Sequence, residues 1–217
     1  MKNLTLIIPA KNEEYSLPKV LDEIKNINCK KFIILGKSDT ATIHSIKNYR
    51  CKIIKQKHNG YGNALIEGIN NVTTDYLCIF NADGSFDPKY LKIMLNRVSI
   101  NKNFIFSSRY MKAGGSDDDS LLTFIGNKIF TFIGKIFFKL KISDILFTYI
   151  MGETYKFKRL KLKNSDFRIC VEIPIKIKKN NFKYISIGSF ERKRLGGVKK
   201  VNEFRDGFSI LLELIKN

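Results

Sequence analysis

Short apolar runs alternate along the first half of the chain with longer segments in which apolar residues recur every three or four positions. The runs have the length of strands and lie at residues 4–8, 32–35, 51–55, 76–80 and 104–107. Helical periodicity falls between them, at residues 17–27, 42–48, 62–70 and 88–99. Strands that alternate with helices in this way predict right-handed crossovers. The expected fold is therefore α/β, with a mainly parallel sheet flanked by helices.

The periodicity changes after residue 108. Residues 121–140 are apolar nearly all round a helix, and Lys128, Lys135 and Lys139 are spaced seven and four apart, so they share one narrow stripe. This pattern is as typical of an amphipathic helix on a bilayer surface as of a helix packed into the core. No run of about 18 uninterrupted apolar residues occurs, so a membrane-spanning helix is not expected.

The chain carries 39 Lys and Arg residues against 20 Asp and Glu, a formal charge of +19. The excess is concentrated between residues 156 and 200, where fifteen basic residues accompany three acidic ones. Such a segment attracts phosphate groups on a nucleotide, on a lipid carrier or on an anionic membrane surface. Nucleic acid is not an expected partner, because no RNA- or DNA-binding motif is recognised and the aromatic residues form no stacking array.

The length of 217 residues and the apolar fraction of 44% are those of one globular domain with a substantial core. Cys29, Cys51, Cys78 and Cys170 are scattered and form no Cys-x-x-Cys pair. This spacing argues against a structural zinc site and against a disulfide framework. We expect reduced packing residues in a cytoplasmic protein.

The strand expected at residues 76–80 ends abruptly in the polar sequence Asn81-Ala82-Asp83-Gly84-Ser85. Amide and carboxylate oxygens at the carboxyl edge of a parallel sheet can hold a divalent cation, beside the place where phosphate-bearing ligands bind. The alternative reading is a tight turn without a ligand. The segment therefore becomes informative only together with others.

Several other segments supply that context. Residues 4–14 form a strand followed by Asn12 and Glu13, and a carboxylate there can accept hydrogen bonds from ribose hydroxyls. Residues 59–68 open a helix with two glycines, which let the backbone approach an anion closely. With residues 76–88, 105–115 and 191–207, these segments resemble the family 2 inverting glycosyltransferases of GT-A fold. Within that family, the chain is most similar to the polyprenyl-phosphate (dolichyl-phosphate mannose) synthases.

The resemblance implies a GT-A (Rossmann-like) domain with a nucleotide-sugar-binding half at residues 1–110. The acceptor-binding half, at residues 111–217, would contain the amphipathic helix and a basic loop. The residues implied to contact the nucleotide sugar are Pro9, Asn12, Glu13, Asp39, Gly60, Gly62, Asn63, Asn81 and Asp83. The implied ligands of a divalent cation, Mg²⁺ or Mn²⁺, are Asn81, Asp83 and Ser85, and the implied catalytic residues are Asp83 and Arg109. The residues implied to bind the acceptor or its phosphate are Arg109, Arg192, Arg194 and Lys199.

The chain departs from the family pattern at two places. Asn81 stands where the Asp-x-Asp motif has its first carboxylate, which lowers the expected affinity for metal. Residues 35–40 keep only Ser38, Asp39 and Thr40 of a motif that helps to hold the base. Asp39 and Thr40 are also in place to cap the next helix. The sequence therefore leaves both GDP- and UDP-sugars open as donors.

The implied function is transfer of a sugar, with inversion, from a nucleotide sugar to a polyprenyl phosphate. The enzyme would be cytoplasmic and peripheral at the inner face of the membrane. A phosphate acceptor is ionised near neutral pH and needs no strong general base. Two alternatives stay open: a transferase acting on a saccharide hydroxyl in cell-surface polysaccharide synthesis, with Asp144 or Glu172 as base, and a degenerate GT-A domain that binds without turnover.

Overall fold

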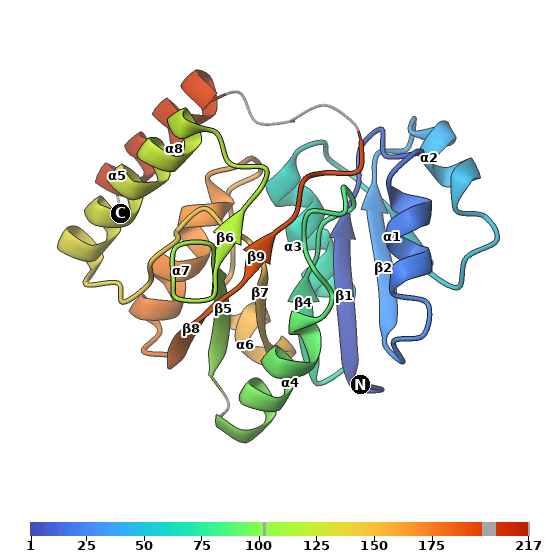
Figure 1. Cartoon of the computed structure of the whole chain (residues 1–217), viewed down its shortest axis with the longest axis horizontal. Coiled ribbons are helices and arrows are strands. Elements are labelled where there is room, and N and C mark those ends of the chain that lie inside the picture. The colour runs from blue at the N-terminus through green and yellow to red at the C-terminus, as the bar shows by residue number, and fades with distance from the viewer. Residues whose placement is uncertain (102, 197–202, 217) are drawn as a thin grey trace.

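A seven-stranded sheet forms the centre of the molecule (Figure 1). The computed structural model describes residues 1–101, 103–196 and 203–216. The strand order is β3-β2-β1-β4-β7-β5-β8. The strands are β1 (Leu4–Pro9), β2 (Lys30–Leu35), β3 (Lys52–Lys55), β4 (Tyr76–Ile79), β5 (Phe104–Ser108), β7 (Ile150–Glu153) and β8 (Tyr184–Gly188). Neighbouring strands are parallel except at β7, which runs antiparallel to both β4 and β5.

Helices cover both faces of the sheet. One face carries α1 (Leu17–Glu23), α2 (Thr40–Ser45) and α4 (Tyr90–Asn101); the other carries α3 (Tyr61–Asn71), α6 (Thr154–Arg159) and α7 (Ile169–Lys179). Side chains of a strand alternate between the two faces, so Leu6 and Ile8 of β1 belong to one core cluster and Ile7 to the other. Burial on both faces explains why β1 reads as an uninterrupted apolar run.

A small parallel sheet extends the main one beyond its carboxyl edge. It pairs β6 (Gly115–Ser116) with β9 (Phe190–Glu191), which follow β5 and β8 respectively. The last residues of β5 and β8, Ser108 and Gly188, are themselves paired. The small sheet therefore brings residues 108–119 alongside residues 189–196, although the two segments are far apart in the sequence.

Two helices lie side by side at one end of the molecule (Figure 1). They are α5 (Leu121–Phe138) and α8 (Glu203–Lys216), and α5 packs against α8 and α7. By length and composition alone, α5 could cross a membrane, and it is the one such helix in the part of the chain that the structure describes. The apolar residues of α5 do not form an uninterrupted run, because three polar residues and two lysines are scattered among them. The expectation that no helix spans a membrane stays a prediction.

The pattern-based expectations for the first half are confirmed. Each of the five expected strands and four expected helices is present, with ends that differ by a few residues. The strands β7 and β8 of this sheet were not expected, and β7 lies between β4 and β5. The two halves of the chain at residues 1–110 and 111–217 therefore contribute strands to one sheet.

Candidate active site

The loop after β4 holds three polar side chains in a fixed arrangement. The Ser85 hydroxyl donates to Asp83 Oδ1 at 2.8 Å and accepts from Asn81 Nδ2 at 3.1 Å. The Ser85 backbone N–H also donates to Asp83 Oδ1, at 3.0 Å. The loop turns at Gly84, whose φ of 84° lies in the left-handed region that a glycine adopts without strain. Ser85 thus orients the other two side chains, and both of its own hydroxyl interactions lie within the loop.

This loop fits a divalent cation with few protein ligands. Because Asn81 uses its NH₂ group toward Ser85, its carbonyl oxygen is available, and Asp83 Oδ2 accepts no hydrogen bond from the described residues. The described residues contain no group of three or more His, Cys, Asp or Glu side chains able to hold a metal ion. One carboxylate and one amide oxygen suit a hard cation such as Mg²⁺, whose remaining positions are taken by substrate phosphates and water. Metal binding by Asn81, Asp83 and Ser85 stays a prediction.

Arg192 fastens this loop to the rest of the protein. Its guanidinium donates to the Gly84 carbonyl at 2.8 and 3.1 Å and to the Phe86 carbonyl at 3.1 Å. The same group pairs with Glu23 of α1, at 2.5 and 2.9 Å. The hydrogen bond to Glu23 raises the pKa of Arg192 above its ordinary value. These contacts indicate that Arg192 positions the loop, whereas its predicted contact with a phosphate stays a prediction.

Arg194 lies closer to the loop's carboxylate. Its guanidinium forms a two-pronged pair with Asp118, at 2.6 and 3.1 Å, and Nη1 lies 3.9 Å from Asp83 Oδ2. The Leu195 N–H donates to the Asp83 carbonyl at 2.8 Å, which holds this segment against the loop. The Arg194 side chain is 23% exposed. Among the three described arginines predicted to bind phosphate, Arg194 therefore has both proximity to Asp83 and access to solvent.

Arg109 is enclosed in a network of acidic side chains. It donates to both oxygens of Asp144 at 2.8 and 2.9 Å and to Glu191 at 3.1 Å, and Asp119 lies 3.7 Å away. Burial alone would lower the pKa of Arg109, but the hydrogen bond and charge of Asp144 and the charge of Glu191 raise it above its ordinary value. The side chain is only 10% exposed. These contacts give Arg109 a structural role in the network, and its predicted contact with a phosphate and its catalytic role stay predictions.

The two carboxylates proposed as a general base are also engaged. Asp144 accepts from Arg109 and from Asn127 of α5, while Glu172 accepts from the backbone of Lys163 and Asn164. Glu172 in addition pairs with the ammonium of Lys176. These contacts keep both carboxylates oriented toward the protein. Neither is placed as a free base.

The residues after β1 lie at the same edge of the sheet, because β1 pairs with β4. Asp39 caps α2 by accepting from the Thr42 N–H at 3.3 Å, and it also accepts from the Asn12 N–H at 2.8 Å. The Glu13 carboxylate accepts from the Ser16 hydroxyl and is 8% exposed. Asp39 is therefore the helix cap that the sequence left open, and it ties the loop after β1 to α2. Pro9 is the last residue of β1.

Gly60 and Gly62 open α3, as expected. The atoms that approach these glycines closely belong to the protein's own backbone. A Cβ atom on Gly62 would lie 2.0 Å from the Asn164 carbonyl oxygen, and one on Gly60 would lie 2.2 Å from the Ser165 carbonyl oxygen. The Asn63 N–H donates to that same Ser165 oxygen at 3.1 Å. The glycines therefore dock the segment at residues 164–165 onto α3. The assignment of Gly60, Gly62 and Asn63 to the nucleotide sugar was based on the family pattern and stays a prediction.

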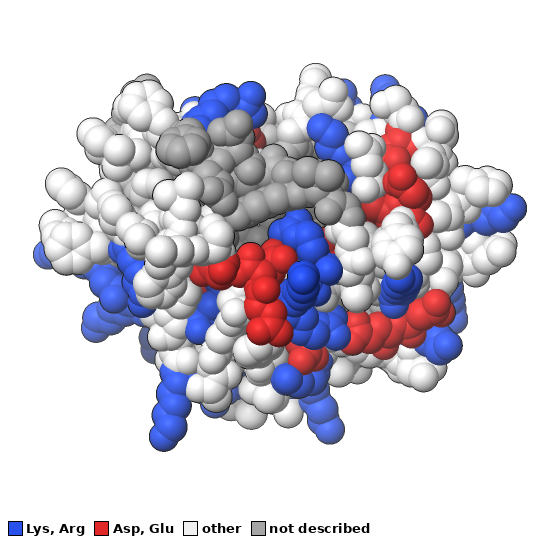
Figure 2. All heavy atoms as spheres, turned by 45° about the horizontal axis from the view of Figure 1, so that its top comes forward, with Lys and Arg blue, Asp and Glu red and all other residues white. Residues whose placement is uncertain are grey.

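Acidic residues that the sequence did not single out complete the site. Asp118, Asp119 and Glu191 surround Arg109 and Arg194, and Ser116 donates to Glu191 at 2.6 Å. Burial raises the pKa of Glu191 above its ordinary value, against the opposing charge of Arg109. Figure 2 shows acidic and basic side chains lying against one another on this face. The run of three acids at residues 117–119 was the available signal. Lys199, the fourth predicted phosphate ligand, lies outside the described residues.

Sequence comparison decides the family. The model of glycosyl transferase family 2 matches residues 5–161. The chain belongs to this family. A curated relative, an uncharacterized glycosyltransferase of Mycobacterium tuberculosis, is 28% identical over 113 residues, which is 51% of this chain and 50% of the relative. An uncharacterized glycosyltransferase of Mycobacterium bovis matches to the same extent. The chain thus spans about half the length of the curated relatives it matches.

Solved structures confirm the GT-A fold of this family 2 chain. Glucosyl-3-phosphoglycerate synthase from Mycobacterium tuberculosis, in complex with UDP, has a TM-score of 0.76 at 11% identity, covering 98% of this chain and 79% of the synthase. Mannosyl-3-phosphoglycerate synthase from Rubrobacter xylanophilus has a TM-score of 0.71 at 12% identity, covering 98% of this chain and 71% of that protein. Identities this low show the fold alone. The narrower likeness to polyprenyl-phosphate synthases stays a prediction.

Proposed function

We propose that this glycosyltransferase transfers a sugar from a nucleoside diphosphate donor to a polyprenyl phosphate at the surface of a membrane. The observation that carries the proposal is the orientation of α5. Its buried positions are Asn127, Thr131 and Gly134. Most of its large apolar side chains instead face solvent: Leu121, Leu122, Phe124, Ile125, Ile129, Phe132, Ile136 and Phe137. The polar side of α5 is thus buried and its apolar side is exposed, which is the reverse of the usual arrangement in a protein surrounded by water.

The buried polar residues of α5 have partners that explain this orientation. Asn127 donates to Asp144, and the Thr131 hydroxyl accepts from the Ile145 N–H at 3.2 Å. These bonds hold one side of α5 against the domain, so the helix lies along the surface of the protein. Lys128 and Lys135 of α5 are both exposed, and their long side chains can reach lipid headgroups.

The neighbouring helix α8 also carries exposed apolar residues. Phe208, Leu212 and Ile215, at spacings of four and three, are 63%, 38% and 69% exposed. Large continuous apolar patches are uncommon on proteins that stay in water and mark a membrane or protein interface. The net charge of +19 favours an anionic membrane surface as the occupant. A cytoplasmic, membrane-peripheral location is part of the proposal.

The loop after β4 suits the transfer chemistry. Asp83 and Asn81 would hold a divalent cation, Mg²⁺ or Mn²⁺, which when bound neutralises negative charge on the leaving diphosphate. Ser85 keeps Asp83 oriented, and Arg192 holds the loop in place. Arg194, near Asp83, is placed to donate to phosphate oxygens if it exchanges Asp118 for them. Asp144 and Glu172 are both held in structural contacts, so neither is placed as a general base. This agrees with an ionised phosphate acceptor, which needs no strong base.

A soluble phosphorylated acid is the second candidate acceptor. It is favoured by the similarity of fold over 98% of the chain to glucosyl-3-phosphoglycerate synthase, which has been solved with Mn²⁺, UDP-glucose and phosphoglyceric acid. Binding of a soluble acceptor of that kind would not explain why the apolar side of α5 is exposed. The two candidates share a phosphate-bearing acceptor and differ in the attached group.

A panel of donors and acceptors tests the proposal. GDP- and UDP-sugars are each incubated with a polyprenyl phosphate, with 3-phosphoglycerate and with a neutral saccharide, with and without Mn²⁺. We expect metal-dependent transfer to the polyprenyl phosphate at rates well above those for the other acceptors. Faster transfer to 3-phosphoglycerate would favour the second candidate, and transfer only to the saccharide would contradict a phosphate acceptor.

The proposed binding of α5 to an anionic membrane has its own test. Replacing both Phe132 and Phe137 with Ser is expected to weaken binding to anionic vesicles at least about tenfold, since burying one large apolar side chain contributes about 1.5–3 kcal/mol. Cosedimentation with vesicles measures this, and the affinity should also fall as salt rises. Phe130→Ser is the matched control, because Phe130 is on the same helix but packs against the core. It should lower the thermal stability and leave vesicle binding of the folded protein unchanged. Equal vesicle binding by parent and double variant would contradict the membrane assignment.

A further inference from the structure

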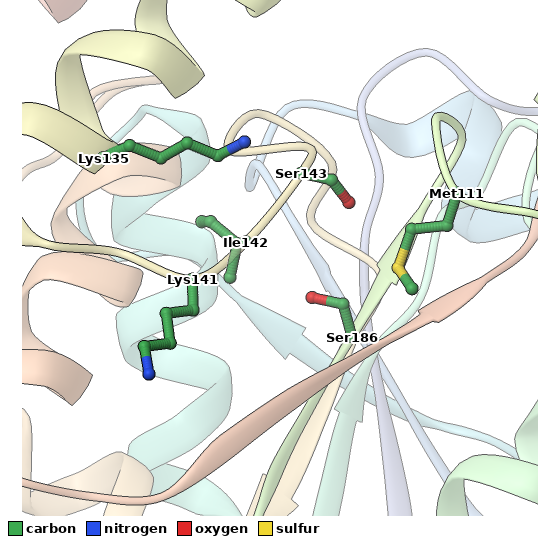
Figure 3. A pocket seen from close by; sticks show the side chains of 6 residues that line it. All are labelled: Met111, Lys135, Lys141, Ile142, Ser143 and Ser186. Carbon is green, nitrogen blue, oxygen red and sulfur yellow. The ribbon is translucent and has the colours of Figure 1, made fainter.

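A cavity of about 400 Å³ lies beside the last turn of α5 (Figure 3). Its lining residues come from four segments: Met111, Lys135, Lys141, Ile142, Ser143 and Ser186. The volume lies within the range of about 300–1,000 Å³ that is usual for small-molecule pockets. No lining residue belongs to the predicted nucleotide-sugar, metal or acceptor residues.

Two hydroxyl groups line the cavity. Ser186 Oγ is buried and has no hydrogen-bond partner among the described residues, which is unfavourable unless a ligand or water supplies one. Ser143 Oγ lies 2.7 Å from Ser108 Oγ, which also accepts from the Tyr110 N–H. Either hydroxyl of this pair can be the donor, and where Ser108 donates to Ser143, the Ser143 O–H is free to donate to a ligand.

The cavity also has a cation at its edge. The Lys135 side chain runs toward the segment that carries Ser143, whereas the ammonium of Lys141 points away (Figure 3). Neither lysine has a carboxylate within ion-pair distance among the residues that the structure describes. Met111 and Ile142 supply apolar wall. An ammonium and two hydroxyl donors beside an apolar wall match an anion of several oxygens that is attached to an apolar stem.

We propose that this cavity binds the phosphate headgroup of an anionic lipid, with Lys135 and the hydroxyls of Ser143 and Ser186 as donors. Its place favours this ligand, because Phe132, which lies three residues before Lys135 and so on the same side of α5, is 62% exposed. A lipid whose chain lies along Phe132 can bring its phosphate to Lys135. The site differs from the sugar-transfer site, and the inference does not depend on the identity of the acceptor.

Calorimetric titration with octyl phosphate, below its micelle concentration and without a sugar donor, tests the site. Octyl glucoside supplies the same stem with a neutral head, and inorganic phosphate supplies the head without the stem. We expect saturable binding of octyl phosphate that is tighter than that of either control. Equal binding of octyl glucoside would overturn the anion site, and equal binding of inorganic phosphate would overturn the lipid as its source.

Variants locate the binding. Lys135→Ala should weaken octyl phosphate binding at least about fivefold, as expected for loss of a charge-assisted hydrogen bond. Lys128→Ala is the matched control, with the same change in net charge on the same helix but outside the cavity. Ser186→Leu should block binding by filling the cavity, with a thermal melt as the check on folding. Equal losses for the two lysine variants, or full binding by a folded Ser186→Leu protein, would overturn the proposal.

Discussion

Replacement of Asp83 by Ala is expected to lower metal-dependent sugar transfer by at least about a hundredfold, the usual effect of losing a group that stabilises charge in the transition state. Asp83 is the one carboxylate in the loop after β4 that faces the proposed cation site, and Asn81 alone offers only a neutral oxygen. Donor binding measured with and without Mn²⁺ separates the metal contribution from folding. Undiminished transfer by the variant at limiting Mn²⁺ would contradict the assignment.

Two variants of the same loop serve as controls. Asn81→Asp restores the carboxylate of the family motif and should tighten Mn²⁺ binding. Asp87→Ala removes a carboxylate that caps the turn before α4, where it accepts from the Lys89 N–H at 2.9 Å. It should lower stability by about 1 kcal/mol with little change in metal dependence. A similar loss of metal dependence in Asp87→Ala would mean that the loop responds to any missing carboxylate.

Replacement of Arg109 by Ala is expected to destabilise the fold by about 3–5 kcal/mol, because it leaves buried carboxylates without their cation. Asp144 and Glu191 are 1% and 8% exposed and both pair with Arg109. Urea unfolding measures the loss. A stable variant with impaired transfer would instead support the phosphate-binding role that the sequence suggested.

The loss of stability in Arg109→Ala should depend on pH in a defined direction. Burial raises the pKa of Glu191 in the folded protein, and removing Arg109 takes away the charge that opposes this rise. The deficit should therefore shrink as the pH falls and Glu191 becomes protonated. Arg168→Ala is the control, since its ion pair with Asp166 is 36% and 44% exposed and should contribute at most about 1 kcal/mol. A deficit of the same size for both arginines would contradict the buried-network explanation.

The first half of the fold could be predicted from the sequence because its signals are local. Buried parallel strands appear as short apolar runs, and amphipathic helices between them show their periodicity within about 10–18 residues. The candidate metal loop also stands out in the sequence, because Asn81, Asp83 and Ser85 lie within five residues of one another. The strand β7 was missed, since its place between β4 and β5 depends on pairing with residues about 45 to 75 positions earlier in the chain.

The sequence by itself determined the family, the alternation of elements and the position of the candidate metal loop. Only the tertiary structure decided the partners of the basic residues. Arg109 and Arg192 pair with groups 35 to 169 positions away, and no local pattern encodes such contacts. The structure also decided which side of α5 faces the domain. Periodicity defines the faces of a helix, but the face that is buried depends on what packs against it, and here Asp144 and the backbone at Ile145 bind the polar one.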